Sequence, residues 1–251
     1  MILANDLVIL YYHRIGKPSA AHRYRGMFTS PQHLRWQVSF LLHKGYQVLT
    51  LAEALQQGPR PQDSPPLACI TFDDGYRDNF SAGLPILHEL GVAATVFIIS
   101  DDVGKKNLIW SEAGEKHPAD LASWDELGLL QQAGWEIASH SHRHVHFSRY
   151  SAVQQEDLLA QCSELIQHYL GVRPQTFAYP YGDYSELSRQ LVRRHGFLGA
   201  VSTRTGLNYR HEQTLFELNR IPCKGFQHYH YLKWLLQTRN LLGSPPYSKI
   251  R

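Results

Sequence analysis

Four alternating histidines stand in the segment "SHSHRHVHF" at residues 139–147. In a β-strand all four would lie on one face, and side chains four residues apart would be separated by ~13 Å, too far to share one ion. One turn of a helix brings residues i and i+4 within ~5–6 Å of each other. A metal-binding segment must therefore leave the strand, using either His140 with His144 or His142 with His146. Position favours the first pair, because His140 lies nearest the end of the preceding apolar run.

Two adjacent carboxylates, Asp73 and Asp74, occur in "TFDDGY" at residues 71–76, directly after the apolar run 67–70. Two histidines and one carboxylate form an open ligand set for a catalytic divalent ion, with one position left for water. The second carboxylate would then accept a proton from that water. The alternatives without a metal are a histidine-rich surface loop and an Asx turn that uses the Asp-Gly pair.

The elements that must position these side chains follow a repeated pattern. A helix-like stretch ends at a glycine, and an apolar, strand-like run follows within a few residues; glycine is the usual residue after a last helical turn, because it accepts positive φ. The five glycines are Gly45, Gly91, Gly134, Gly171 and Gly196. Helix starts are predicted at Ser30-Pro31, at the capping box formed by Ser123 and Glu126, and at Ser151.

The predicted strands number about seven once "DLVILYY" at 6–12 and "PLACITF" at 66–72 are added. Continuous apolar strands that alternate with helices indicate a mostly parallel sheet covered by helices. The number of units favours an α/β fold of the closed or nearly closed (β/α) barrel type, in one domain spanning residues 1–251. Chemistry in such a barrel lies on the loops that follow the strands. The segments "HRIG", "DDG", "HSHRHVH" and "PYGDY" all follow apolar runs.

The composition of the 251 residues limits the remaining classes of function. A net charge of +3 is too small for a dense basic nucleic-acid-binding surface. Three widely spaced cysteines indicate reduced thiols. No stretch reaches the ~18–20 apolar residues of a membrane span. The start, "MILANDLVILYYHR", lacks a basic export signal, so we expect a cytoplasmic protein, with association with the cell envelope as the alternative.

Three motifs in order resemble those of the polysaccharide deacetylases, carbohydrate esterase family 4 with its NodB-like domain: "TFDDGY" at 71–76, "SHSHRH" at 139–144 and "FAYPYGDY" at 177–184. The resemblance covers nearly the whole chain and implies a distorted (β/α) barrel. It implies that Asp74, His140 and His144 bind one divalent ion. Two imidazoles and one carboxylate suit zinc, and cobalt, nickel and manganese are the alternatives. His142 and His146 would then face solvent or support the ligands.

The same resemblance implies roles for three further residues. Asp73 would be the general base. Pro180 and Tyr181 would line the acetate pocket, with the backbone N–H of Tyr181 helping to hold the oxyanion.

Two features depart from the common family pattern. No arginine stands shortly before Pro180, and no late motif supplies a catalytic acid, since "HYHYLKWLL" resembles the start of a helix. Both features resemble the branch of the poly-β-1,6-N-acetylglucosamine deacetylases, where an early "YH" brings a histidine into the site. This makes His13 the candidate general acid, with capping of the first strand as its alternative role. Either Arg14 or Arg220 could replace the missing arginine.

The predicted function is therefore metal-dependent removal of N-acetyl groups from a polysaccharide or oligosaccharide containing N-acetylglucosamine. The alternatives are deacetylation or deformylation of a lipid- or nucleotide-linked sugar, and non-catalytic carbohydrate binding. Trp110 and Trp124 could stack on sugar rings or simply anchor their own loops. The C-terminal helix and tail, residues 228–251, are expected to pack on the barrel, with membrane contact as the alternative. The oligomeric state is left open.

Overall fold

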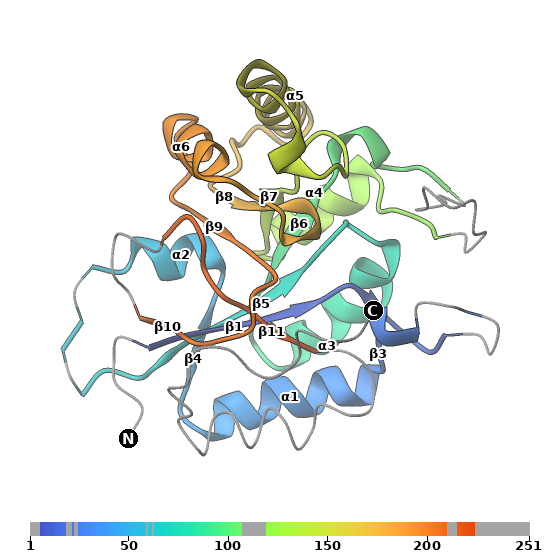
Figure 1. Cartoon of the computed structure of the whole chain (residues 1–251). Helices are drawn as coiled ribbons and strands as arrows, with labels where there is room; N and C mark the ends of the chain where they lie inside the picture. The colour runs from blue at the N-terminus through green and yellow to red at the C-terminus, as the bar shows by residue number, and fades with distance from the viewer. Residues whose placement is uncertain are drawn as a thin grey trace.

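The computed structural model describes residues 6–18, 22, 25–58, 60–61, 63–106, 119–209 and 215–223. Trp110 and the predicted C-terminal helix at 228–251 lie outside these ranges. Figure 1 shows the strands in the middle of the molecule, with α1 and α3 on one side and α5 and α6 on the other. In the described part of the chain, no helix is both long and apolar enough to cross a bilayer.

Within the described ranges the main sheet has nine strands, and its central order is β10-β1-β5-β6-β7-β8-β9. Its strands are β1 (Asp6–Tyr12), β4 (Gln47–Leu49), β5 (Leu67–Phe72), β6 (Thr95–Ile98), β7 (Glu136–Ser139), β8 (Thr176–Ala178), β9 (Gly199–Val201), β10 (Asn208–Tyr209) and β11 (Ile221–Pro222). The seven predicted strands, β1 and β4 to β9, all form and pair in parallel. Among the strands described, β10 is the one that pairs antiparallel, against β1. A separate two-stranded sheet joins β2 (Arg14–Ile15) and β3 (Phe28–Thr29).

The segment 215–223 connects the two ends of the parallel set. Leu218 donates its backbone N–H to Ala200 of β9 at 2.9 Å, and Cys223 donates to Tyr11 of β1 at 3.0 Å. In between, β11 pairs in parallel with β1. The sheet thus curls around on itself, and the predicted distorted (β/α) barrel is confirmed.

In the described part of the chain, five helices end within two residues of the predicted glycines and three begin directly after the predicted serines, whereas the short helix between β4 and β5 was not predicted. The helices are α1 (Pro31–His43), α2 (Leu51–Gln56), α3 (Leu84–Glu89), α4 (Trp124–Gln132), α5 (Ala152–Leu170) and α6 (Glu186–Arg194). Ser30, Ser123 and Ser151 each accept a backbone N–H of the first turn with their side chains. All five glycines predicted to end helices have positive φ, and a strand of the main sheet follows each one.

Two sets of buried side chains explain why the strands are apolar on both faces. Along β1, Leu7 and Ile9 belong to a cluster that also contains Leu51 of α2, whereas Val8 and Leu10 pack in the cluster that includes α1 and α3. The first cluster fills the barrel and the second lies under the helices. Burial on both faces is typical of parallel strands, which therefore read as continuous hydrophobic runs. The three cysteines are free and buried, as predicted.

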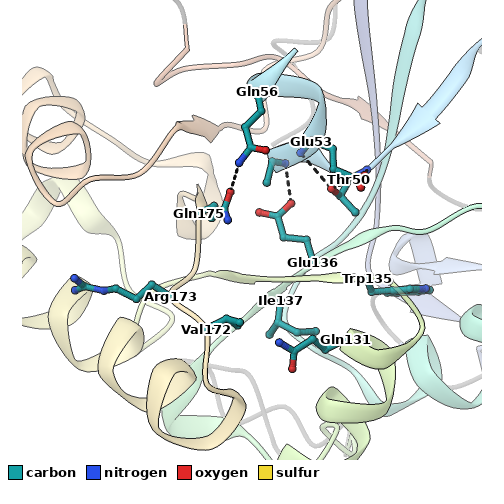
Figure 2. Close-up of a pocket in the computed structure, with 12 residues that line it drawn as sticks. Thr50, Glu53, Gln56, Gln131, Trp135, Glu136, Ile137, Val172, Arg173 and Gln175 are labelled. Carbon is teal, nitrogen blue, oxygen red and sulfur yellow. Dashed lines mark hydrogen bonds between the residues drawn. The ribbon is translucent and has the colours of Figure 1, made fainter. Parts of the chain in front are cut away.

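A cavity of about 230 Å³ lies beside Glu136, the first residue of β7. Its carboxylate accepts hydrogen bonds from the hydroxyls of Thr95 (2.9 Å) and Thr176 (2.6 Å), and from the backbone N–H of Ala52 in α2 (2.9 Å). Figure 2 shows Glu136 reaching toward α2. Because His140 follows the other end of β7, this cavity lies at the opposite end of the strand from the histidines. Glu136 therefore holds α2 against three strands and has no place in the site described below.

Replacing Glu136 by alanine should lower the free energy of unfolding by roughly 1–3 kcal/mol, because three donors lose their acceptor. Urea denaturation measures this change. Arg173→Ala, at an exposed position beside the same cavity, should stay within about 0.5 kcal/mol of the parent protein. Equal stabilities for the two variants would contradict the role given to Glu136.

Candidate metal centre

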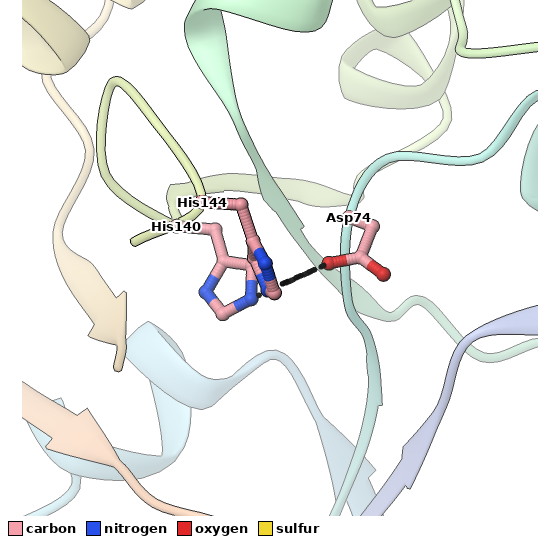
Figure 3. Close-up of side chains that lie close together, drawn as sticks. All are labelled: Asp74, His140 and His144. Atoms are coloured by element: carbon pink, nitrogen blue, oxygen red, sulfur yellow. Dashed lines mark ion pairs between the residues drawn. The ribbon is translucent and has the colours of Figure 1, made fainter. Parts of the chain in front are cut away.

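The loops that follow β5 and β7 bring Asp74, His140 and His144 together. Oδ1 of Asp74 lies 3.5 Å from Nε2 of His140 and 3.7 Å from Nε2 of His144. One ligand atom from each residue fits within a group no wider than 4.8 Å. Figure 3 shows both imidazoles turned toward the carboxylate. Of the two histidine pairs open from the sequence, His140 with His144 is the pair that meets Asp74.

The loops that bring the three side chains together begin with left-handed backbone just after their strands. Among the described residues, only three other than glycine have positive φ: Asp74 (71°), Ser141 (72°) and Tyr181 (59°). They follow β5, β7 and β8, and each stands in or beside the cluster. Such backbone costs about 1–3 kcal/mol per residue and gathers where function requires it. The turn at Ser141 takes the chain out of β7, so that His144 can fold back beside His140.

Hydrogen bonding orients His140 as a ligand. The ring is buried, and its Nδ1 lies 2.7 Å from the carbonyl oxygen of Ala178 in β8. A carbonyl can only accept, so Nδ1 carries a proton, and Nε2 is the nitrogen that faces Asp74. A histidine ligand is usually held in this way by a hydrogen bond to its other nitrogen.

The charges of the cluster suit a cation. Burial would raise the pKa of Asp74, but His140 and His144 outweigh it and hold that pKa well below its usual range. Burial lowers the pKa of His144 to about 4. At neutral pH Asp74 is therefore ionised and His144 neutral, the forms that bind metals.

The carboxylate of Asp74 also has unused capacity. Its Oδ1 is buried and has no hydrogen-bond partner among the described residues. Ligands about 2.0–2.2 Å from a tetrahedral Zn²⁺ lie roughly 3.4 Å from one another, close to the separations seen here. The three residues fit a divalent ion.

Asp73 is held by a buried arginine. Nη1 and Nη2 of Arg220 each donate to one carboxylate oxygen of Asp73 at 2.7 Å, and Nε donates to the carbonyl of Ser202 at 2.9 Å. The guanidinium lies over the ring of Tyr11 at 4.4 Å, and the arginine has no exposed surface. Burial would raise the pKa of Asp73, but Arg220 outweighs it and lowers that pKa.

This pairing separates the two arginines left open by the sequence. Arg14 donates instead to Asp78, with Nε 2.8 Å from Oδ2. Arg220 is therefore the arginine that contacts Asp73. Sequence analysis also missed Tyr11, although it directly precedes the "YH" that drew attention to His13.

His13 follows the last residue of β1 and lies near both aspartates. Its positive charge, when protonated, lowers the pKa of Asp73 and of Asp74. Its ring meets the ring of Tyr11 edge-on at 5.8 Å. The structure thus brings the candidate acid to the same end of the barrel as the candidate base.

The turn Pro180–Gly182 after β8 adds a half-exposed aromatic ring. The ring of Tyr181 meets His144 edge-on at 4.2 Å and stacks on His146 at 4.3 Å. A Cβ at Gly182 would lie 2.1 Å from Oγ1 of Thr203, so only glycine fits there. Pro180 is buried in this turn. His146 thus supports Tyr181, and Nδ1 of His142 pairs with the hydroxyl of Ser100 at 2.9 Å.

Trp124, the first residue of α4, stacks on Tyr169 of α5 with ring centroids 4.5 Å apart. This contact accounts for the ring as packing between helices. Sugar binding by Trp124 stays a prediction, and Trp110 lies outside the described residues.

The chain is similar in sequence to known proteins over most of its length. A family model described as polysaccharide deacetylase matches residues 60–200. The Bacillus subtilis (strain 168) protein YxkH is 29% identical over 218 residues, which are 86% of this chain and 70% of that protein. A poly-β-1,6-N-acetyl-D-glucosamine N-deacetylase of Staphylococcus aureus (strain MRSA252) is 26% identical over 215 residues, 76% of this chain and 70% of that protein.

Two solved structures have the same fold. The Streptococcus pyogenes deacetylase PplD, in complex with acetate, aligns with a TM-score of 0.74 at 23% identity and covers 96% of this chain and 99% of that one. IcaB from Ammonifex degensii aligns with a TM-score of 0.75 at 21% identity and covers 92% and 97%. At these identities the likeness shows the fold alone.

Calorimetric titration of metal-free protein with Zn²⁺ should give one site per chain. His140→Ala and His144→Ala should each weaken binding by at least roughly 100-fold, because each removes a ligand. His142→Ala, in the same segment, is the matched control and should bind as the parent does. Unchanged affinity in both ligand variants would refute the site.

Replacing Arg220 by methionine should destabilise the protein by roughly 3–5 kcal/mol, because Asp73 would be left buried and unpaired. Arg77→Ala breaks the ion pair between the exposed side chain of Arg77 and Glu126, and should leave the stability nearly unchanged. Thermal and urea denaturation compare the two. Similar losses of stability in the two variants would show that the buried Asp73–Arg220 pair contributes no more than an exposed one.

Proposed function

The chain belongs to the polysaccharide deacetylase family, and on that premise we propose that it is a metal-dependent N-deacetylase acting on glycans that contain N-acetylglucosamine. The observation that carries the proposal is the meeting of two groups at one end of the barrel: the cluster of Asp74, His140 and His144, and the Asp73–Arg220 pair. The name of the Staphylococcus aureus relative supports this class of substrate.

Asp74, His140 and His144 would hold one divalent ion. Two imidazoles and one carboxylate suit zinc, and the same donors also accept cobalt, nickel or manganese. When bound, such an ion polarises an acyl carbonyl and activates water for attack. The protein's part is to orient the three donors toward one point, as the hydrogen bond from His140 to Ala178 does for that ring.

Asp73 acts as the general base. Both of its oxygens accept from Arg220, yet each carboxylate oxygen has two acceptor positions, so one remains on each for a proton from the attacking water. The arginine keeps Asp73 ionised and restricts its rotation. Fixed orientation is what makes a general base effective, since misplacement by about 1 Å can cost ~10²-fold in rate.

The remaining residues handle the charge that develops during the reaction. Tyr181, held in left-handed backbone beside His144, offers its backbone N–H to the oxyanion of the tetrahedral intermediate. His13 gives a proton to the nitrogen of the sugar amine as the C–N bond breaks. Acetate and a free amino sugar are the products.

Acetate release from a panel of N-acetylated glycans, with and without chelator, tests the proposal. Asp73→Asn should lower kcat by roughly 10²–10⁴-fold while the metal content stays at one per chain, because the base is lost and all three proposed metal ligands remain. Asp125→Asn, exposed on α4, is the control and should retain full activity.

Two results would overturn the assignment. One is full activity of the Asp73→Asn variant, which would remove the base. The other is no acetate or formate from any glycan or carrier-linked sugar when the site is loaded with metal, which would favour non-catalytic carbohydrate binding.

A further inference from the structure

Two consecutive polar residues, Asp78 and Asn79, hold the turn that carries His13. Nδ2 of Asn79 donates to the backbone carbonyl of His13 at 2.7 Å. Oδ1 of Asp78 accepts the backbone N–H of Ile15 at 2.9 Å, and Oδ2 accepts Nε of Arg14 at 2.8 Å. Three adjacent residues of one loop are thus bonded to two adjacent residues of another.

His13 lies between the end of β1 and the start of β2, so its carbonyl falls outside the pairing of the main sheet. The pairing of β1 with β5 ends at Tyr12 and Phe72, followed by one bond from the N–H of Asp73 to the carbonyl of Tyr12. The carbonyl of His13 therefore falls past the last bond of that ladder. The side chain of Asn79, only 1% exposed, supplies its donor from the neighbouring loop.

The support extends to the side chain of Arg14. Its guanidinium lies 4.7 Å from the ring centre of Phe28 and 5.1 Å from that of Tyr76. Asp78 neutralises the charge from the side. Arg14 does not contact Asp73; its own contacts with Phe28, Tyr76 and Asp78 hold the backbone directly after His13.

Asp78 and Asn79 also belong to the loop of the aspartates. They stand four and five residues after Asp74, and Asn79 begins a short π-helix, Asn79–Gly83. Single turns of π-helix often occur at functional sites. The loop that carries Asp73 and Asp74 therefore also carries the residues that hold the turn of His13. The distance between His13 and the two aspartates depends on this one short stretch of chain.

We propose that Asn79, assisted by Asp78, is a positioning residue that holds His13 in place to protonate the leaving amine. The inference rests on the proposed deacetylase function. In the step concerned, a proton moves from the imidazolium of His13 to the nitrogen of the departing sugar amine as the C–N bond breaks, and His13 becomes neutral. Without the bond from Asn79, the turn moves and the proton donor is misplaced.

The leaving group provides the test. An amine needs a proton in order to leave, whereas the nitrophenolate of 4-nitrophenyl acetate leaves without one. Asn79→Ala and His13→Ala should each lower kcat for the N-acetylated glycan by roughly 10²-fold, the usual size of a positioning or acid–base effect. Hydrolysis of 4-nitrophenyl acetate should change by less than about threefold, and the double variant should be no slower than His13→Ala alone, because the two residues act through one group.

Gln37→Ala is the matched control. Gln37 is also a buried amide beside β1, where its Oε1 accepts the hydroxyl of Tyr12 at 2.8 Å. Its loss should lower stability without changing the ratio of amide to ester hydrolysis. Asp78→Asn is a second variant in case Asn79→Ala does not fold. It should also lower the ratio of amide to ester hydrolysis, but by less than Asn79→Ala.

Several outcomes would overturn the inference. The first is an equal loss of kcat on the N-acetylated glycan and on 4-nitrophenyl acetate. The second is a double variant whose loss of kcat is the product of the two single losses. The third is an Asn79→Ala variant that hydrolyses the glycan amide at the full rate. An ester-to-amide ratio unchanged in His13→Ala would do the same. In each case the parent protein still releases acetate from the glycan, whereas failure of the metal-loaded parent to do so would reject the proposed function itself.

Discussion

The ion pair between Asp73 and Arg220 is the interaction on which the rest of the site depends. Its partners are 147 residues apart in sequence and almost completely buried. Removing either partner from such a pair is costly, because the other charge is left in a medium that solvates it poorly. Arg220 lies on segment 215–223, which hydrogen-bonds to both β9 and β1. The segment that connects the two ends of the parallel set therefore also orients the carboxylate of Asp73.

The two ends of the barrel do different work. At the end where the strands begin, Glu136 accepts three hydrogen bonds and ties α2 to the sheet. At the end where they finish, the chain adopts left-handed backbone at Asp74, Ser141 and Tyr181. Strain of this kind persists only where the surroundings hold it in place. The rigid parallel ladder directly beneath these turns provides that support.

Cross-loop contacts then complete the arrangement. A carbonyl of β8 orients His140, which follows β7. The loop after β5 holds the turn after β1 through Asn79 and Asp78. Ser148, after β7, donates its hydroxyl and N–H to Asp183, after β8. The turn after β1 is thus held by the loop after β5, and the chain segments after β7 and β8 are bonded to each other.

Local signals in the sequence determined much of this protein. Serine caps, glycines with positive φ and apolar runs located three helix starts, five helix ends and the seven parallel strands, since each depends on backbone preferences within a few residues. The residues of the metal cluster were also predicted: the motifs that follow strands gave the candidates, and the resemblance to the polysaccharide deacetylases selected Asp74, His140 and His144 among them. Tertiary structure alone decided between Arg14 and Arg220, placed Tyr11 under the guanidinium, paired Trp124 with Tyr169 and brought Asn79 to His13. Those contacts join segments that are distant in the sequence, and only the curvature of the closed sheet brings them into reach.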